Sequence, residues 1–169
     1  MSGKGKEVKI EKLQKLDHET LERLIEIYMK AYEGMREYGG EGESYAKRYL
    51  RWCWGKAKDG FFVAKIGDRI VGFIVCDKDW YSKYEGKVVG AIHEFVVDRA
   101  YQGHGIGHKL MDKCLEYLRD TGRIELWVGE KNYGAMRFYE KYGFRKVGQH
   151  GIWIRMVLDT KKEINGKAD

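Results

Sequence analysis

The sequence predicts an α/β (α+β) protein built around a strand, a glycine-rich turn and a helix. Residues 92–97 form an apolar run of strand length, and residues 106–118 repeat apolar side chains at helical spacing. Residues 61–76 alternate in polarity around Gly67-Asp68, which indicates a β-hairpin. Two helical patterns precede this hairpin, and further strand patterns follow the central helix. The chain therefore mixes strands and helices along its whole length.

The other elements follow from the same two periodicities. Apolar side chains at Val8 and Ile10 predict a first strand, and a helix over about 21–29 ends before Gly34. The remaining expected elements are a helix at 44–58, a polar turn at 77–86, a strand from near Val88, a strand at 124–128, a helix at 132–142, and strands at 144–148 and 152–158.

Length and composition favour one globular domain. We expect a single domain over residues 8–158, a flexible segment at 1–7 and a polar tail at 159–169. A hydrophobic content of 43% with 34% charged residues argues against a disordered or membrane-spanning chain. No apolar stretch reaches membrane-spanning length, and no signal-peptide core follows the N-terminal lysines. We therefore predict a cytoplasmic protein with no membrane partner.

Cysteines and charge point to no metal and no nucleic acid. Cys53, Cys76 and Cys114 are far apart and lack metal-ligand spacing. Cys76 and Cys114 fall at apolar positions and are expected in the core, whereas the pattern does not place Cys53. The net charge of +6 is spread among acidic residues, which favours a solvated surface over nucleic-acid binding. Some positive potential would help to recruit a ligand that carries phosphates.

The turn before the central helix has the properties of a pyrophosphate site. The first amides of a helix lack partners inside it and favour anions. The glycines would let a phosphate approach and allow positive φ angles. Gly107-His108-Lys109 does not end as a P-loop does, and His108 stands where a dinucleotide fingerprint needs glycine. A tight turn without a ligand remains the alternative. The turn consists of Gln102, Gly103, His104, Gly105, Ile106, Gly107 and His108.

The pattern Gln-x-x-Gly-x-Gly in this turn resembles the acyl-CoA loop of the GCN5-related N-acetyltransferases (GNAT superfamily). A second motif, Asn132-Tyr133-Gly134-Ala135-Met136-Arg137-Phe138-Tyr139-Glu140-Lys141-Tyr142-Gly143-Phe144, matches that superfamily's Asn-x-x-Ala-x-x-Phe-Tyr-x-x-x-Gly-Phe signature at every fixed position. The motif also has a local reading, with Asn132 as a helix N-cap and Gly143 as the left-handed residue after the helix. The resemblance covers roughly residues 60–158 and implies a GNAT fold, a mixed, mostly antiparallel central sheet flanked by about four helices. Two central strands splay apart in such a fold and leave a wedge for acyl-CoA.

The resemblance implies an acyltransferase that uses acetyl-CoA as co-substrate, with no metal. The backbone of Phe95, Val96 and Val97 would pair with the pantetheine, and Gln102 through His108 would contact the pyrophosphate. Asn132 and Tyr139 would face the pantetheine and thioester, and Ala135 belongs to the same binding motif. The chain has Asp98-Arg99-Ala100 where relatives usually have proline, which loosens the loop slightly and removes no ligand.

The implied reaction is the direct attack of a primary amine on the thioester. A backbone N–H near Val97 would hold the oxyanion. Tyr139 would hydrogen-bond the departing sulfur, although a phenol of pKa ~10 giving its proton to a thiolate of ~8.5 is uphill by about 2 kcal/mol. Glu94 or His93 would be the base, with Glu94 slightly favoured, because strand neighbours face opposite sides unless a bulge turns both. Structural pairing is the alternative for each residue.

The acceptor is not identified by the sequence. By resemblance, the first two helices and their loop form one wall of the acceptor site. Protein N-termini, lysines and small amines all remain open, and an α-amine of pKa ~8 needs less help from a base than a lysine of ~10.4. A non-catalytic acyl-CoA-binding regulatory module is the alternative function, and a homodimer is among the assemblies left open. The candidate wall residues are Tyr32, Tyr38, Tyr45, Tyr49 and Trp52, for which core packing is favoured. An acidic cluster around the loop could attract an amine, although charge runs are usually solvated faces; it consists of Glu33, Glu37, Glu41 and Glu43.

Overall fold

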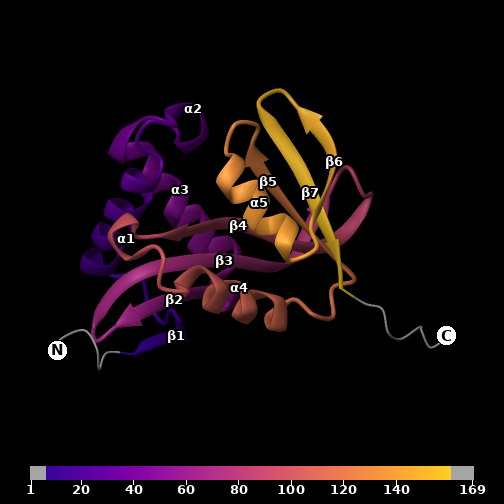
Figure 1. The fold of residues 1–169 in the computed structure, drawn as a ribbon. Coiled ribbons are helices and arrows are strands. Elements are labelled where there is room, and N and C mark those ends of the chain that lie inside the picture. Colours follow the sequence, from indigo (N-terminus) through magenta and orange to yellow (C-terminus); the bar gives the residue numbers. More distant parts are fainter. Residues whose placement is uncertain (1–6, 161–169) are drawn as a thin grey trace. The chain divides into compact units, whose positions relative to one another are not determined.

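The computed structural model describes residues 7–160 (Figure 1). Residues 1–6 and 161–169, which hold most of the expected N-terminal segment and C-terminal tail, lie outside the described residues. Within the described range no helix is long and apolar enough to cross a membrane. The main elements are β1 (Val8–Lys12), α1 (His18–Ala31), α2 (Arg36–Gly39), α3 (Gly42–Lys56), β2 (Phe61–Ile66), β3 (Arg69–Ser82), β4 (Lys87–Val97), α4 (Ile106–Tyr117), β5 (Arg123–Gly129), α5 (Tyr133–Lys141), β6 (Arg145–His150) and β7 (Trp153–Asp159).

The strands form one mixed sheet in the order β1-β2-β3-β4-β5-β7-β6. β1 with β2, β2 with β3, β5 with β7 and β6 with β7 pair antiparallel, whereas β4 and β5 pair parallel. This confirms the predicted mixed, mostly antiparallel sheet. The described residues divide into an N-terminal unit, which contains residues 7–76 and 94–116, and a C-terminal unit, which contains residues 77–93 and 117–160.

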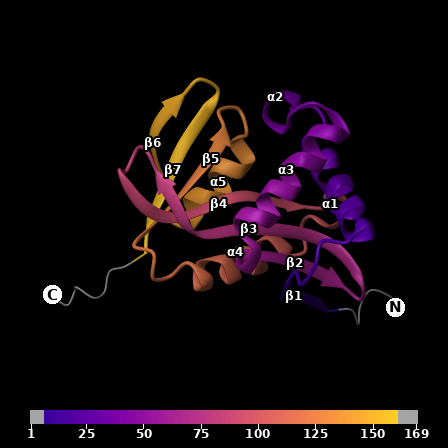
Figure 2. The same ribbon diagram turned by 180° about the vertical axis from the view of Figure 1, so that it is seen from behind.

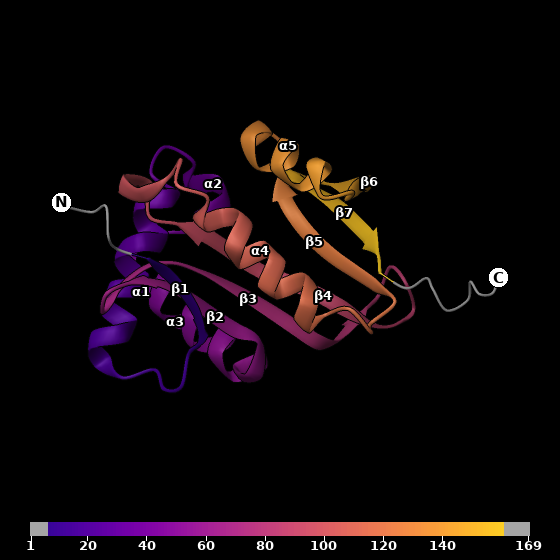
Figure 3. The same cartoon turned by 60° about the horizontal axis from the view of Figure 1, so that its bottom comes forward.

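The N-terminal unit has helices on both faces of its strands. Successive side chains of β2 and β3 alternate between the faces, so Phe61 and Phe73 pack with the helices α1 and α3. On the other face, the ammonium of Lys113 on α4 lies 5.5 Å from the Phe62 ring. Figure 2 shows α3 across these strands, and Figure 3 shows α4 on the opposite side.

Helix α1 contains the predicted helical segment 21–29 and extends beyond it at both ends, to His18 and Ala31. The side chain of Asp17 accepts a hydrogen bond from the Thr20 amide at 3.0 Å and so caps the first turn. Leu21, Leu24 and Tyr28 lie on the face that packs inward, each at most 3% exposed. The packing of α1 thereby fixes the position of Tyr32, the residue that follows the helix, beside the core.

One expectation about the elements was wrong, and the region before α3 differs from the expectation in two details. The turn expected at 77–86 is strand as far as Ser82, because the buried side chains of Asp77 and Ser82 have hydrogen-bond partners there. The short helix α2 was not foreseen, and α3 begins at Gly42 rather than residue 44. Cys76 and Cys114 are buried as expected, and Cys53, which the pattern did not place, is buried among α1 and α3.

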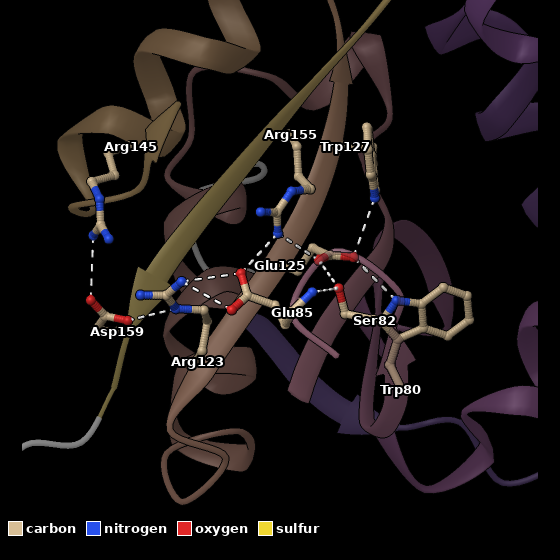
Figure 4. A network of polar contacts seen from close by, with 9 residues as sticks. All are labelled: Trp80, Ser82, Glu85, Arg123, Glu125, Trp127, Arg145, Arg155 and Asp159. Carbon is tan, nitrogen blue, oxygen red and sulfur yellow. Dashed lines mark hydrogen bonds and ion pairs between the residues drawn. The ribbon is translucent and has the colours of Figure 1, made fainter. Parts of the chain in front are cut away.

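The C-terminal unit contains a buried polar network on β5 and its neighbours (Figure 4). Glu125 is 2% exposed, and its carboxylate accepts hydrogen bonds from Ser82 Oγ at 2.6 Å and Arg155 Nη1 at 2.8 Å. The indole N–H groups of Trp80 and Trp127 also donate to it, at 3.2 and 3.4 Å. The buried charge is thus both paired and hydrogen-bonded, as burial requires.

Candidate active site

Glu94 lies near the end of β4 within the N-terminal unit, and its side chain meets two helices. One carboxylate oxygen, Oε2, accepts a hydrogen bond from the Tyr32 hydroxyl at 2.7 Å. The other, Oε1, accepts one from the Tyr49 hydroxyl at 3.0 Å. Tyr32 is the residue that ends α1, and Tyr49 lies within α3. The two helices therefore fix both oxygens of one buried carboxyl group.

Burial makes this carboxyl group a weaker acid than an ordinary glutamate. Desolvation raises the pKa of Glu94 from 4.5 to about 7, even though the hydrogen bonds from Tyr32 and Tyr49 act to lower it. A group with this pKa is divided between its charged and neutral forms near neutral pH. Such a pKa suits a general base, because the efficiency of proton transfer is greatest when the pKa lies near the working pH.

An aromatic array surrounds Glu94. The ring centroids of Tyr28 and Tyr32 are 4.9 Å apart, and those of Tyr28 and Tyr49 are 5.7 Å apart. Burial is the larger cause and the charge of Glu94 the smaller cause that raise the pKa of Tyr28 and of Tyr49 well above the usual value. The Tyr49 hydroxyl therefore stays protonated and remains a donor to the carboxylate. The array continues from Tyr49 to the rings of Tyr45 and Trp52 on α3.

The five aromatic residues proposed for the acceptor wall occupy different environments. Tyr38 is buried, Tyr32 and Tyr49 pack at the edge of the core, and Tyr45 and Trp52 are 36% and 45% exposed. Of the acidic cluster, Glu33 lies 3.3 Å from Arg99, while Glu37, Glu41 and Glu43 are exposed.

A pocket of about 310 Å³ opens beside Tyr32. Its lining includes Tyr28, Met29, Glu33 and Gly39 in addition to Tyr32. The Tyr28 hydroxyl donates to the Gly39 carbonyl at 2.9 Å, which fixes α2 against α1. A Cβ atom at Gly39 would lie only 2.5 Å from the Cβ of Tyr32, so glycine is required at this position.

The turn before α4 has the backbone expected of an anion loop. Gly103 and Gly105 have φ angles of +87° and +78°, and residues 102–105 are exposed. Helix α4 follows directly, with the Lys109 amide bonded to the Gly105 carbonyl at 3.2 Å. The expectation of a positive φ is wrong for Gly107, which lies in the first turn of α4. A glycine-rich loop that leads into a helix N-terminus is a common kind of anion site in proteins.

The second motif forms α5 in the C-terminal unit. The Asn132 side chain accepts a hydrogen bond from the Ala135 amide at 3.4 Å, which confirms its role as N-cap. Gly143 has a φ of +100° just after the helix, as expected. Tyr139 is 8% exposed, and its ring packs against Phe144 with centroids 5.8 Å apart.

His93, the other candidate base, belongs to the C-terminal unit. Its Nε2 lies 2.8 Å from the Asp77 Oδ2, and its ring meets Trp80 edge-on at 4.9 Å. Among residues 7–160, no three His, Cys, Asp or Glu side chains are placed to hold a metal ion. Strand β4 pairs with β5 at only three positions, from Gly90–Ile124 to Ile92–Leu126, although β4 runs on to Val97.

The sequence analysis missed two residues that support the site. Tyr28 lies within the helix predicted over about 21–29, and its four-residue spacing from Tyr32 is the sequence signal that places the two rings together. Arg23 was not singled out, and it forms an ion pair with Asp98 at the start of the anion loop. That pairing joins residues 75 positions apart, so no local pattern could have indicated it.

Comparisons with known proteins agree with this architecture. The family model described as "Acetyltransferase (GNAT) family" matches residues 21–144. An uncharacterized N-acetyltransferase of Archaeoglobus fulgidus is 40% identical over 136 residues, which are 79% of this chain and 92% of the relative. The crystal structure of a Pyrococcus horikoshii protein is 65% identical, covers 92% of this chain and all of its own, and has a TM-score of 0.86.

A more distant structure shows the same fold. The PaiA N-acetyltransferase of Thermoplasma acidophilum, crystallised in complex with coenzyme A, is 22% identical with a TM-score of 0.68 and covers 90% of this chain and 99% of its own. With the family match spanning most of the sequence, these likenesses identify the chain as an acetyltransferase that belongs to the GNAT family.

Proposed function

We propose that this protein transfers an acetyl group from acetyl-CoA to an α-amine, such as a protein N-terminus, by direct attack in a ternary complex. The observation that carries the proposal is the buried Glu94 carboxyl group, with a pKa of about 7 and both oxygens fixed by tyrosine hydroxyls. Glu94 is the proposed base. The pocket beside Tyr32 is the proposed place for the group that carries the amine.

The pKa of Glu94 favours an α-amine over a lysine. An α-ammonium of pKa about 8 is roughly one unit less acidic than Glu94, so proton transfer to the carboxylate costs on the order of 1 kcal/mol. A lysine ammonium of pKa about 10.4 lies more than three units above Glu94, and the transfer costs roughly 4 to 5 kcal/mol. The difference of about 3 kcal/mol corresponds to more than a hundredfold in rate if both acceptors bind equally well.

Acetyl-CoA, when bound, supplies the acetyl group as a reactive thioester. We propose that the amides of Gly103 to Gly107 and the first turn of α4 hold its pyrophosphate, and that the backbone of Phe95 to Val97 aligns the pantetheine. The exposed loop with positive φ at Gly103 and Gly105 supports this assignment. Asn132 and Ala135, at the start of α5, are proposed to contact the pantetheine.

The ammonium nitrogen gives up two protons in this reaction, and the chain's own groups take the first. The Glu94 carboxylate takes one from the ammonium, and the freed lone pair forms the new bond to the acetyl carbon. The carbon–sulfur bond breaks, the sulfur leaves with the bonding electron pair, and the nitrogen gives its second proton to water, which leaves a neutral amide. Tyr139 is proposed to donate a hydrogen bond to that sulfur, which stabilises the thiolate without full proton transfer. His93 is the second candidate for the base.

The test is thiol release from acetyl-CoA with matched acceptors. One peptide carries a free α-amine and no lysine, and its partner has a blocked N-terminus and one lysine. We expect turnover with the first peptide and a rate at least about a hundredfold lower with the second. Glu94→Gln and Tyr139→Phe should each lower kcat, and His93→Gln serves as the comparison for the second candidate base.

Three results would change the conclusion. Preference for the lysine peptide would remove the α-amine assignment. Full activity of Glu94→Gln with loss of activity in His93→Gln would transfer the role of base to His93. Tight acetyl-CoA binding with no turnover across a broad amine panel would favour the non-catalytic binding module.

A further inference from the structure

The start of the anion loop is held by a residue of α1. Arg23 donates from Nη2 to the Asp98 Oδ2 at 2.5 Å, and from Nε to the Ile70 carbonyl at 2.8 Å. The side chains of Arg23 and Asp98 are only 13% and 7% exposed. The guanidinium therefore joins α1, the beginning of β3 and the residue that follows β4. This pair is far better shielded from solvent than an ordinary surface ion pair.

Asp98 uses all of its polar groups at this point. Its second carboxylate oxygen accepts from the Ala100 amide at 3.0 Å, its own amide donates to the Val71 carbonyl at 2.8 Å, and its carbonyl accepts from the Tyr101 amide at 2.8 Å. These bonds form the 3-10 turn Arg99–Tyr101, which leads directly into Gln102. Burial opposes ionisation of Asp98, but the hydrogen bonds from Ala100 and Arg23 outweigh it and keep its pKa below the usual value.

The backbone at Asp98 is held at an angle that proline would impose. Its φ is −54°, within the narrow range fixed by a proline ring. The chain contains no proline. A second contact supports the same turn, because Arg99 Nη2 donates to the Lys30 carbonyl near the end of α1 at 2.6 Å. Side-chain contacts to α1 thus restrict a segment whose sequence carries no rigid residue.

We propose that Arg23 and Asp98 are positioning residues that hold the approach to Gln102–His108 in the conformation that binds the CoA pyrophosphate. The inference rests on the proposed function, since it assigns that loop to CoA. Its physical basis is pre-organisation. A loop that is already ordered by contacts made during folding does not have to be ordered by the ligand. Only molecules whose loop has the binding conformation bind CoA, so the apparent affinity decreases when fewer molecules have that conformation.

The experiment compares the parent with Asp98→Asn, Arg23→Met, the double variant and Arg23→Lys. Glu11→Gln is the matched control, because it breaks the 2.8 Å ion pair between Lys65 and Glu11 in the same unit, whose side chains are 29% and 49% exposed. CoA affinity is measured by calorimetry, KM and kcat by thiol release, and loop order by hydrogen exchange of residues 99–105 in the ligand-free protein. Thermal unfolding shows which variants are folded.

We expect Asp98→Asn and Arg23→Met to weaken CoA binding about tenfold and to accelerate exchange in residues 99–105, with KM rising more than kcat falls. The double variant should be no worse than the poorer single variant, because both remove the same ion pair. Arg23→Lys should recover part of the affinity, and it keeps the test open if Arg23→Met does not fold. Glu11→Gln should match the parent.

The outcomes separate the inference from the proposed function. If the parent binds CoA and the folded variants bind it equally well with unchanged exchange, the positioning role is overturned and the proposed function stands. If affinity falls only in proportion to a general loss of stability, with exchange faster throughout the chain, the positioning role is also overturned. If the parent does not bind CoA at all, both fail.

Discussion

Replacing Glu94 with glutamine should raise the stability of this protein above neutral pH while it lowers the activity. The substitution keeps the shape of the side chain and removes its titration. In the parent, the folded pKa is about 7, compared with an ordinary value of 4.5. A raised carboxyl pKa means that folding favours the protonated form. The stability that this group contributes is therefore fully present below pH 4.5 and is lost as the pH rises through 7.

The size of the effect follows from the shift. A rise of the pKa from 4.5 to about 7 corresponds to about 3 kcal/mol of unfolding free energy between pH 4.5 and pH 8. The glutamine side chain does not titrate, so the variant does not lose this free energy as the pH rises. At pH 8 it should be more stable than the parent by up to about 3 kcal/mol, whereas at pH 4.5 the two proteins should agree within about 1 kcal/mol. The activity should change in the opposite direction, with kcat falling 10²-fold or more, roughly the loss expected for a general base.

Urea unfolding, followed by tryptophan fluorescence between pH 4.5 and pH 8, measures the difference. Comparing the two proteins at each pH cancels the other carboxyl groups, such as Asp98 and Asp159, whose lowered pKa values make stability rise with pH. Glu33→Gln is the control, because its side chain is 72% exposed. In the parent, kcat/KM should rise with an apparent pKa of about 7. An unchanged stability difference across the pH range would refute the reasoning.

Tyr49→Phe removes a hydrogen bond that lowers the pKa of Glu94, so the pH profile of kcat/KM should move to higher pH; a shift to lower pH would contradict this. Gly105→Ala forces a side chain into a φ of +78°, costs about 1–2 kcal/mol and should weaken CoA binding in calorimetry, whereas equal affinity would argue against the loop assignment. Arg155→Met leaves the Glu125 charge buried without its cation and should lower the unfolding free energy by about 3–5 kcal/mol, compared with under 1 kcal/mol for the exposed Lys12→Gln; similar small losses would contradict the structural role of the pair.

Local patterns predicted the motif-bearing elements because their signals lie within a few residues of one another. Asn132 caps α5 through an amide three positions away, and the turn between β4 and α4 has the expected glycine conformations at Gly103 and Gly105. The hydrophobic periodicity likewise placed α1 and the β2–β3 hairpin. For each of these, sequence spacing translates directly into spatial proximity.

The missed features depend on distant partners. Asp77 and Ser82 looked like turn residues, yet β3 continues through them because His93 and Glu125 satisfy their side chains. The environment of Glu94 was equally hidden, since its two hydroxyl partners lie 62 and 45 positions earlier. The position of Glu94 on the central strand made it a candidate base, but its raised pKa arises from burial by residues distant in the sequence.

The close packing of Gly39 on Tyr32 restricts how this protein can evolve. Any side chain at position 39 must displace Tyr32, because the first added carbon would already overlap it. Tyr32 also lines the pocket and donates to Glu94, so a change that reshapes the pocket here also disturbs the acidity of the carboxyl group. Variation in what the pocket accepts is therefore more accessible at lining positions such as Met29 and Arg36 than through Gly39. Selection on the shape of the pocket at position 39 would therefore also act on the acidity of Glu94.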